Sequence, residues 1–333
     1  RDPLWSRGLG DVYKRQAQRL RNEAASLSPT QAKLDEATRL FVKGQFRESE
    51  KLAQELVREN PHDVNAALLL ARLAMMASCY EDAREILERI VDKQPRFIAA
   101  WHDLGTVLKE CHEYEEAVAV LEKALTLEPE NALTHYYHGA ALAMAARPAE
   151  AVESYEKAVS IDPELPGAHI GLGHVLKTVG DQEGGIAAYR RAIDLRPNFG
   201  ETYYSLANLK TFRFTEQDVY AMSQRLANDS LPVECRVHFA FSLGKAFEDQ
   251  KDYDRAFEHY ALANQLHRDT IAYDPVQTGV AHERMREVFS ADYFASRGDE
   301  SGCQSADPIF IVCLPRSVST LLEQILASHS LVD

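Results

Sequence analysis

The sequence has few cysteines, no long apolar run and no excess of basic residues. Its 333 residues include five scattered cysteines without a Cys-x-x-Cys pair, so neither a zinc site nor a disulfide framework is predicted. No apolar stretch approaches the ~20 residues of a membrane helix. Lys and Arg number 37 against 51 Asp and Glu, and the net charge of −14 disfavours general binding to nucleic acid or to an anionic membrane. These absences favour a cytoplasmic protein without a metal.

The first residues fit no periodic pattern. Residues 11–16 resemble the in-frame translation of a transposon end that is used to prepare sequencing libraries. We therefore interpret 1–16 as a non-native leader and 17–29 as a lead-in, and we leave both out of the fold argument.

Proline recurs at a fixed interval. The prolines lie 34 residues apart, at Pro61, Pro95, Pro129, Pro163 and Pro197. A constant period of this size is typical of stacked repeats. Each proline suits a helix end, because it lacks a backbone N–H and disfavours helix in the residue before it. Alignment on the prolines gives five units: 30–63, 64–97, 98–131, 132–165 and 166–199.

Small residues recur in register within these units, where two helices would cross closely. One column contains Ala37, Ala71, Gly105, Gly139 and Gly173. A second column contains Ser49, Ala83, Ala117, Ala151 and Gly185. Unit 98–131 has the fullest pattern, and we expect Trp101, Leu104 and Leu121 to be buried between its helices. The pattern resembles the tetratricopeptide repeat (TPR), which implies an all-α superhelical solenoid of helix pairs.

The repeat pattern weakens after Lys210 and returns later. A sixth unit begins at Gly200, and the segment 215–228 predicts an amphipathic helix with Thr215 as its N-cap. A further unit is predicted at 237–270, and 276–290 predicts one more helix. The predicted solenoid therefore covers 30–290.

A stack of such repeats offers a groove lined by the first helix of each unit. The candidate groove residues are Arg72, His102, Thr106, Lys109, Tyr136, His174, Lys177, Tyr204 and Asn208. An extended surface of this kind suits a protein or peptide partner better than a small molecule. The alternative for each residue is an ordinary solvated helix face.

The last residues have a different pattern. The stretch 291–307 predicts a linker, because its second half is polar and rich in Gly and Ser. Residues 308–313 then predict a buried strand, 314–320 a hydroxyl-rich turn and 321–327 a helix. A turn between a strand and a helix N-terminus favours a bound phosphate, through free N–H groups and the helix dipole. The alternative is an ordinary helix N-cap, and the absence of a Walker pattern disfavours an ATPase.

The turn Leu314–Thr320 resembles the 5′-phosphosulfate loop of sulfotransferases, written Pro-Arg/Lys-Ser-Gly-Thr/Ser-Thr. With the repeats before it, the stretch 308–333 is similar to the family of TPR sulfotransferases, as are 206–211 and 241–249. The resemblance implies that the family transfers a sulfonate group from 3′-phosphoadenosine 5′-phosphosulfate (PAPS) to a protein or peptide hydroxyl, without a metal. The residues that would bind the 5′-phosphate of PAPS are Arg316, Ser317, Ser319 and Thr320.

Two residues depart from the family pattern, because Cys313 and Val318 stand where family members usually have glycine. Glycine lets the backbone approach phosphate closely, and a β-branched Val318 crowds the loop. The family's 3′-phosphate segment and its acidic base would follow Asp333, so no catalytic residue is assigned. We therefore expect this chain to be the scaffold and the first strand–loop–helix of a truncated sulfotransferase domain, inactive by itself. The alternative is a TPR adaptor without catalytic activity.

Overall fold

The computed structural model describes residues 29–209, 211–271 and 273–297, together with Gln324, Leu326 and Ser328. All regular structure in these described parts is helical, and none of them forms a strand. The chain divides into two compact units, Arg1–Thr270 and Ile271–Asp333. Each unit is described separately below.

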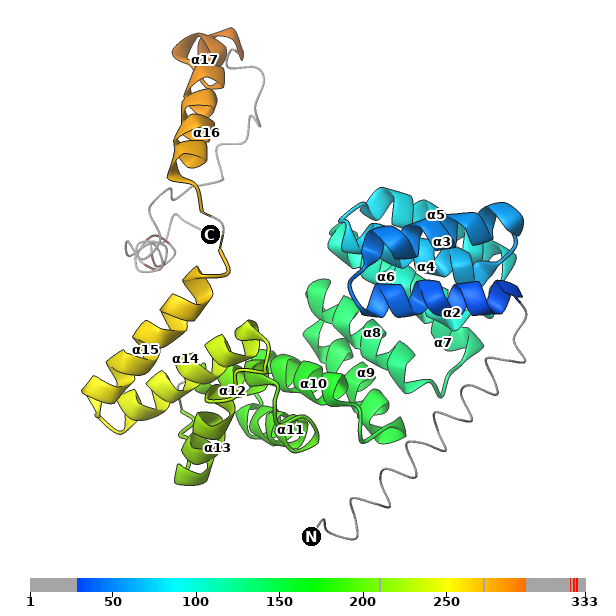
Figure 1. Ribbon diagram of the computed structural model, residues 1–333. Coiled ribbons are helices and arrows are strands. Elements are labelled where there is room, and N and C mark those ends of the chain that lie inside the picture. Colours follow the sequence, from blue (N-terminus) through cyan, green and yellow to red (C-terminus); the bar gives the residue numbers. More distant parts are fainter. Residues whose placement is uncertain are drawn as a thin grey trace, which may run out of the picture. The chain divides into compact units, whose positions relative to one another are not determined.

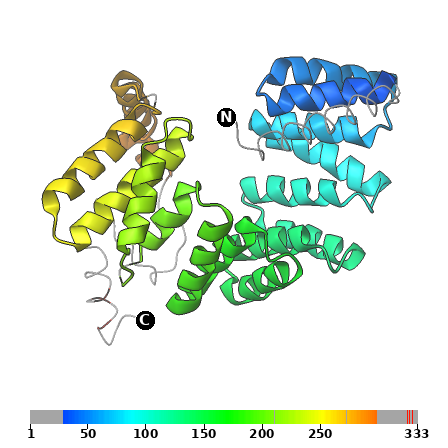
Figure 2. The same cartoon turned by 60° about the horizontal axis from the view of Figure 1, so that its bottom comes forward.

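The described part of the first unit begins with five antiparallel helix pairs that follow the proline period (Figure 1). The first three pairs are α2 (Pro29–Val42) with α3 (Phe46–Glu59), α4 (Val64–Met76) with α5 (Tyr80–Lys93), and α6 (Ile98–Glu110) with α7 (Tyr114–Leu127). The next two pairs are α8 (Ala132–Met144) with α9 (Pro148–Ile161), and α10 (Pro166–Val179) with α11 (Gln182–Leu195). Each second helix also packs against the first helix of the next pair (Figure 2). The prediction of five helix pairs within 30–199 is confirmed.

Close crossing of the two helices explains the column of small residues. A Cβ atom on Gly105 would lie 2.8 Å from Leu121 Cδ1, and one on Gly173 would lie 2.6 Å from Tyr189 Cε1. In each case the large partner is 16 residues further along the chain, on the second helix of the same pair. Leu121 and Tyr189 are both fully buried. A small residue is therefore needed wherever the partner side chain is large, since atoms cannot approach this closely.

The turn within each pair uses a left-handed backbone conformation at the same repeat position. Gly44 and Gly180 have φ values of 75° and 96°, but the equivalent Ser78, His112 and Ala146 also have positive φ, between 58° and 64°. The left-handed residue lets the next N–H reach back to the helix end, as in the 2.9 Å bond from Arg147 N to Leu142 O.

Four further helices follow in the described part of the first unit: α12 (Gly200–Ala207), α13 (Glu216–Leu226), α14 (Val233–Asp249) and α15 (Tyr253–Arg268). The Thr215 hydroxyl accepts a hydrogen bond from Asp218 N, and the Asp218 carboxylate accepts one from Thr215 N, so the predicted N-cap is part of a capping box. Helices α14 and α15 form the predicted later pair, in which Gly244 faces Tyr260 at the same 16-residue spacing.

Among the described residues of the first unit, the buried side chains form three core clusters. The largest involves helices α4 to α11, a second extends from Tyr189 to Ala263, and a small one joins α2, α3 and α4. Trp101, Leu104 and Leu121 have exposed fractions of 8%, 3% and 1%, so their predicted burial is confirmed.

The second unit contains α16 (Pro275–Val288) and α17 (Ala291–Arg297). Helix α16 matches the helix predicted at 276–290. The predicted solenoid range of 30–290 includes α16, whereas the division into units separates α16 from the repeats. Helix α17 occupies the start of the predicted linker, because the Ser290 hydroxyl accepts a hydrogen bond from Tyr293 N and caps a new helical turn.

Several predictions fall on residues outside the described parts of the chain. They concern the leader and lead-in up to residue 28, the strand at 308–313 and the loop at 314–320. Within the helix predicted at 321–327, Gln324 and Leu326 are helical.

Candidate partner-binding surface

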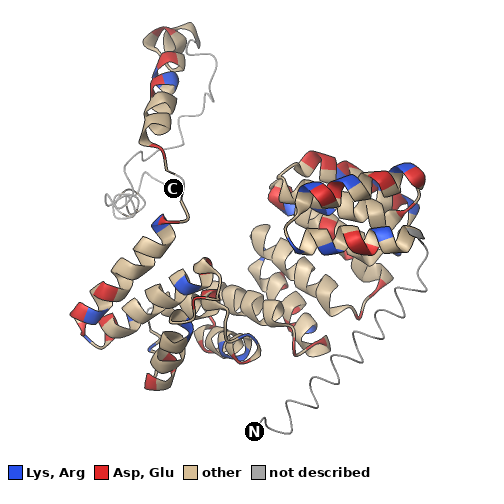
Figure 3. Ribbon diagram, in the orientation of Figure 1, with Lys and Arg blue, Asp and Glu red and all other residues tan. Residues whose placement is uncertain are grey.

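The first helices of the pairs differ in charge from the second helices. Helix α8 contains no Lys, Arg, Asp or Glu, and α10 contains only Lys177 among these residue types. Helices α3 and α5 are rich in both signs of charge, as the coloured ribbon shows (Figure 3). Polar contacts on the first helices therefore come mainly from histidine, tyrosine and threonine side chains.

Three of the predicted groove residues lie close together on α4 and α6. Arg72 Nε donates a hydrogen bond to Asp103 Oδ2 at 2.6 Å. His102, on the adjacent position of α6, is buried, and its ring bonds to the Thr134 hydroxyl at 2.8 Å. The Thr106 hydroxyl donates to the His102 carbonyl. The contacts of Asp103 and His102 therefore join α6 to α4 and to α8.

Burial makes His102 hard to protonate. Desolvation lowers the pKa of the His102 imidazole to about 4, and the charge of Arg72 lowers it further, while Glu128 opposes the shift. The ring stacks on Tyr137 with 4.8 Å between centroids. His102 is therefore neutral at pH 7, and its Nε2 is already engaged with Thr134.

Lys109 and Tyr136 lie in different environments. Lys109 Nζ is 3.7 Å from Glu110 Oε1, and its side chain is 30% exposed. Tyr136 is partly buried and packs edge-on against Tyr137, with its ring next to Gly167 of α10. Burial raises the pKa of the Tyr136 phenol, so this group stays protonated and can donate a hydrogen bond.

His174 and Lys177 lie on α10. His174 Nδ1 is 2.8 Å from the Tyr189 hydroxyl, and Lys177 is exposed near the end of the helix. Burial lowers the pKa of His174, while the carboxylate of Glu201 opposes this shift. Glu201 opposes the burial-driven lowering of the pKa of His238 in the same way. It is therefore a negative charge close to two predominantly neutral histidines.

Two neighbouring cavities lie between α12, α14 and α15; Tyr204 lines both, and Asn208 lines one of them. One cavity has a volume of about 350 Å³ and is lined by Tyr204, Ala207, Asn208, Phe241, Lys245 and Tyr260. The other, of about 260 Å³, is lined by Tyr204, Glu234, Val237, His238, Phe241, His267 and Thr270. Tyr204 and Phe241 line both cavities, with 6.0 Å between their ring centroids. We call this pair of cavities the aromatic site.

Polar groups surround the first cavity of the aromatic site. Lys245 Nζ donates a hydrogen bond to Asp249 Oδ1 at 2.5 Å, and its side chain is 28% exposed. The Tyr260 hydroxyl donates to Glu248 Oε2 at 2.6 Å, and burial together with this carboxylate raises the pKa of the phenol. The amide of Asn208 is exposed. The cavity thus offers an amide and an ammonium group beside aromatic rings.

The second cavity is built on a stacked pair of rings. Tyr204 and His238 have ring centroids 5.2 Å apart at an interplanar angle of 23°. Burial lowers the pKa of His238, so its imidazole is mainly neutral at pH 7. Glu234 places a carboxylate at the same cavity.

The structure thus brings together two groups of the predicted residues. Arg72, His102 and Thr106 make hydrogen bonds at neighbouring positions of α4 and α6, and Tyr204 and Asn208 line one cavity. The predicted set lacks Phe241 and Lys245. Gly244 matches the first small-residue column, so Phe241 continues the repeat position of Tyr204, and Lys245 continues that of Asn208. Extension of these columns across the break after Lys210 would have identified both residues.

The described residues contain no group of three or more His, Cys, Asp or Glu side chains that could hold a metal ion. Among the helices in the described parts, none combines the length and the apolar character that a membrane crossing requires.

Consecutive helix pairs stacked at a constant period define the class of helical-repeat proteins. Within this class, residues 40–108, 105–145, 146–165 and 166–199 match tetratricopeptide-repeat family models. The region 40–199 is therefore a run of tetratricopeptide repeats, as the proline period predicted.

Similar proteins share only part of the chain. An uncharacterized protein of Aquifex aeolicus is 36% identical over 124 residues, which are 37% of this chain and 16% of that protein. Among solved structures, TTC0263, a thermophilic TPR protein of Thermus thermophilus, is 21% identical with a TM-score of 0.48, over 52% of this chain and 94% of that chain. MamA from Desulfovibrio magneticus is 20% identical with a TM-score of 0.44, over 51% and 97% of the two chains.

Proposed function

We propose that the repeats bind a peptide segment of a partner protein at the aromatic site. The observation that carries this proposal is the pair of cavities that share Tyr204 and Phe241 as a common wall. Two adjacent cavities suit two side chains of one bound segment. Aromatic walls give such side chains a large apolar contact at a small cost in conformational entropy.

The polar groups at the site suit the backbone and the charge of a peptide. The Asn208 amide can both donate to and accept from a peptide backbone. The Lys245 ammonium has three donors and uses one for Asp249, so it can also bond to a peptide carbonyl or carboxylate. Specificity then comes from these polar groups, and most of the affinity from the rings.

The test is selection of binding peptides from a random library on the whole chain, followed by titration of the best binder. Phe241→Ala and Asn208→Ala should each weaken the binding of that peptide by about tenfold, because truncation of a central contact at an interface costs more than ~1 kcal/mol of binding free energy. Lys43→Ala, an exposed change on the distant α2–α3 turn, is the control and should leave the affinity unchanged. Equal affinity of the wild type and Phe241→Ala would reject the site.

We also propose that the partner bound by the repeats is the acceptor for sulfonate transfer from PAPS. Support comes from the motif at 314–320, which resembles a 5′-phosphosulfate loop. Arg316 would bind the 5′-phosphate as a bidentate cation, while Ser317, Ser319 and Thr320 would donate hydroxyl hydrogen bonds. The alternative remains a TPR adaptor that binds partner proteins and has no catalytic activity.

Titration with adenosine 3′,5′-bisphosphate separates these two functions, because this chain is expected to bind the nucleotide without transferring sulfonate by itself. Arg316→Ala should abolish nucleotide binding, whereas Val318→Gly should strengthen it by relieving crowding in the loop. Arg268→Ala, at the end of α15, is a control for loss of a positive charge elsewhere. Nucleotide affinity that is the same in Arg316→Ala and in the wild type would favour the adaptor.

A further inference from the structure

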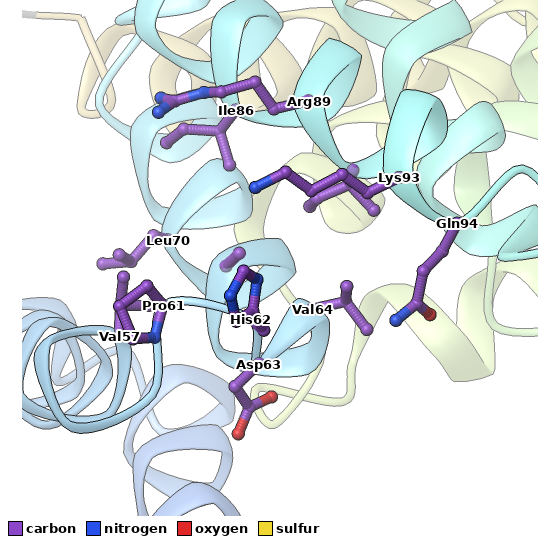
Figure 4. A pocket seen from close by; sticks show the side chains of 12 residues that line it. Val57, Pro61, His62, Asp63, Val64, Leu70, Ile86, Arg89, Lys93 and Gln94 are labelled. Atoms are coloured by element: carbon purple, nitrogen blue, oxygen red, sulfur yellow. The ribbon is translucent and has the colours of Figure 1, made fainter.

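A third cavity lies away from the aromatic site, between α3, α4 and α5. Its volume is about 620 Å³, within the range of small-molecule and side-chain pockets. Its walls are mainly apolar and include Val57, Val64, Leu70 and Ile86 (Figure 4). The cavity is accessible from outside, so a group presented by another molecule could enter it.

The repeat register explains why this cavity exists. Its wall includes Ala67, the fourth residue of unit 64–97. The fourth residue of the next unit is Trp101, whose indole Nε1 donates a hydrogen bond to the Pro95 carbonyl at 2.7 Å. The methyl group of Ala67 can neither fill this volume nor donate to the equivalent carbonyl of Pro61, which also lines the cavity.

The two following units repeat the contact with a different ring. His135 Nε2 is 2.8 Å from the Pro129 carbonyl, and His169 Nε2 is 3.0 Å from the Pro163 carbonyl. In three consecutive units, therefore, an aromatic ring N–H donates a hydrogen bond to the carbonyl of the preceding repeat proline. The unit with Ala67 has a proline, Pro61, at the same repeat position but no such ring.

The charges at the cavity favour an acidic partner. Lys93 extends across the opening from α5, and it makes no ion pair within the described parts of the chain (Figure 4). Arg89 is also at the rim, with its guanidinium 3.5 Å from Glu85. The carboxylate at the rim, Asp63, is already used as the N-cap of α4 and accepts from two backbone N–H groups. The charged group at the opening that has no ion-pair partner in the described parts of the chain is therefore the positive Lys93.

We propose that this cavity binds a tryptophan side chain of a partner peptide in which acidic residues flank the tryptophan. The indole would occupy the place that Trp101 occupies in the next unit, and its N–H would donate to the Pro61 carbonyl. The Lys93 ammonium would contact the neighbouring carboxylates and the face of the ring. This site is separate from the aromatic site and does not depend on it.

The test is fluorescence anisotropy of a fluorescein-labelled peptide, Asp-Glu-Trp-Glu-Asp, titrated with the whole chain. We expect saturable binding that weakens by about tenfold or more when the peptide tryptophan is replaced by alanine. Ala67→Trp should cause a similar loss, because the new side chain fills the cavity from within. Equal affinity of the two peptides, or no binding at ~1 mM protein, would overturn the proposal.

Surface variants keep the test valid if Ala67→Trp disturbs folding. Lys93→Glu should weaken binding several-fold, whereas Lys51→Glu, the same charge change at an exposed position of α3, should not. Equal affinities of these two variants would overturn the charge argument. Phe241→Ala should bind the acidic peptide with the same affinity as the wild type. The two proposed sites can therefore be rejected independently of each other.

Discussion

Single residues in this chain are set by their place in the repeat more than by their chemical type. Ser78, His112 and Ala146 adopt the left-handed conformation that Gly44 and Gly180 adopt at the same repeat position. Their chemistry does not favour that backbone, since a Cβ atom crowds it. The shared turn geometry imposes it. This feature was not predictable from the sequence, because three of the five residues are not glycine.

We expect Ala146→Gly to stabilise the protein by about 1 kcal/mol, because glycine removes the strain of a positive φ. Urea denaturation of the two proteins measures this difference. Ala119→Gly, at an exposed site inside α7, is the matched control and should destabilise by about 1 kcal/mol. If both glycines destabilise equally, the left-handed position carries no strain.

His102 should make stability depend on pH. The imidazole has a pKa of about 4 in the folded state and about 6.5 when unfolded, so the unfolded chain binds more protons between these values. Stability should therefore fall as the pH drops from 7 to 5, with about 2 kcal/mol from this residue. His102→Gln should lose that part of the pH dependence in urea titrations at the two pH values. An identical pH dependence in the variant would contradict the assignment.

The helix pairs explain which elements sequence analysis could predict. Proline period and small-residue columns encode a pair completely, so all five pairs within 30–199 and the buried Trp101 were predictable. The later pair α14–α15 keeps the 16-residue spacing between Gly244 and Tyr260 and was predictable too. Helix α17 was not predictable, because it lies in a stretch expected to be a linker and a single hydrogen bond to the Ser290 hydroxyl caps its start.

The register of the pairs predicts the cost of a core truncation. Leu104 is 3% exposed and belongs to the largest core cluster. Leu104→Ala should destabilise by ~2–5 kcal/mol through lost burial and the cavity left behind. Thermal and urea denaturation measure the loss, with the exposed Leu133→Ala as control. An unchanged unfolding midpoint for Leu104→Ala would show that the register is wrong.

At the scale of the whole molecule, the division between Thr270 and Ile271 separates the repeats from the later helices. No buried residue occurs in α16, and the buried core residues of the described chain end at Ala263. The sequence did not reveal this boundary, since α16 has the length and the proline start of another repeat helix. Of the aromatic site, Tyr204 and Asn208 were predicted, but Phe241 and Lys245 were not. These two residues occupy the same repeat positions as Tyr204 and Asn208, but the repeat pattern is interrupted between them.

We expect residues 29–270 expressed alone to fold cooperatively and to unfold at nearly the same temperature as the repeats in the whole chain. The reason is that every cluster of buried core residues found in the described parts of the chain lies within this range. Circular dichroism melting of both proteins tests this. A fall in the midpoint of the shorter chain of more than a few degrees would mean that residues 271–333 contribute to the stability of the repeats.

The constant spacing also limits how the length of such a chain can change in evolution. Each repeat ends with the same turn and presents the same small-residue crossing, so removal of one complete 34-residue unit joins two surfaces that already match. An insertion or deletion of any other size within a helix rotates the following residues by about 100° per residue around the helix axis and moves the small residues off the crossing. Gene duplication and loss can thus lengthen or shorten the binding surface in whole repeats, while the aromatic site, which lies beyond the regular units, keeps its own geometry.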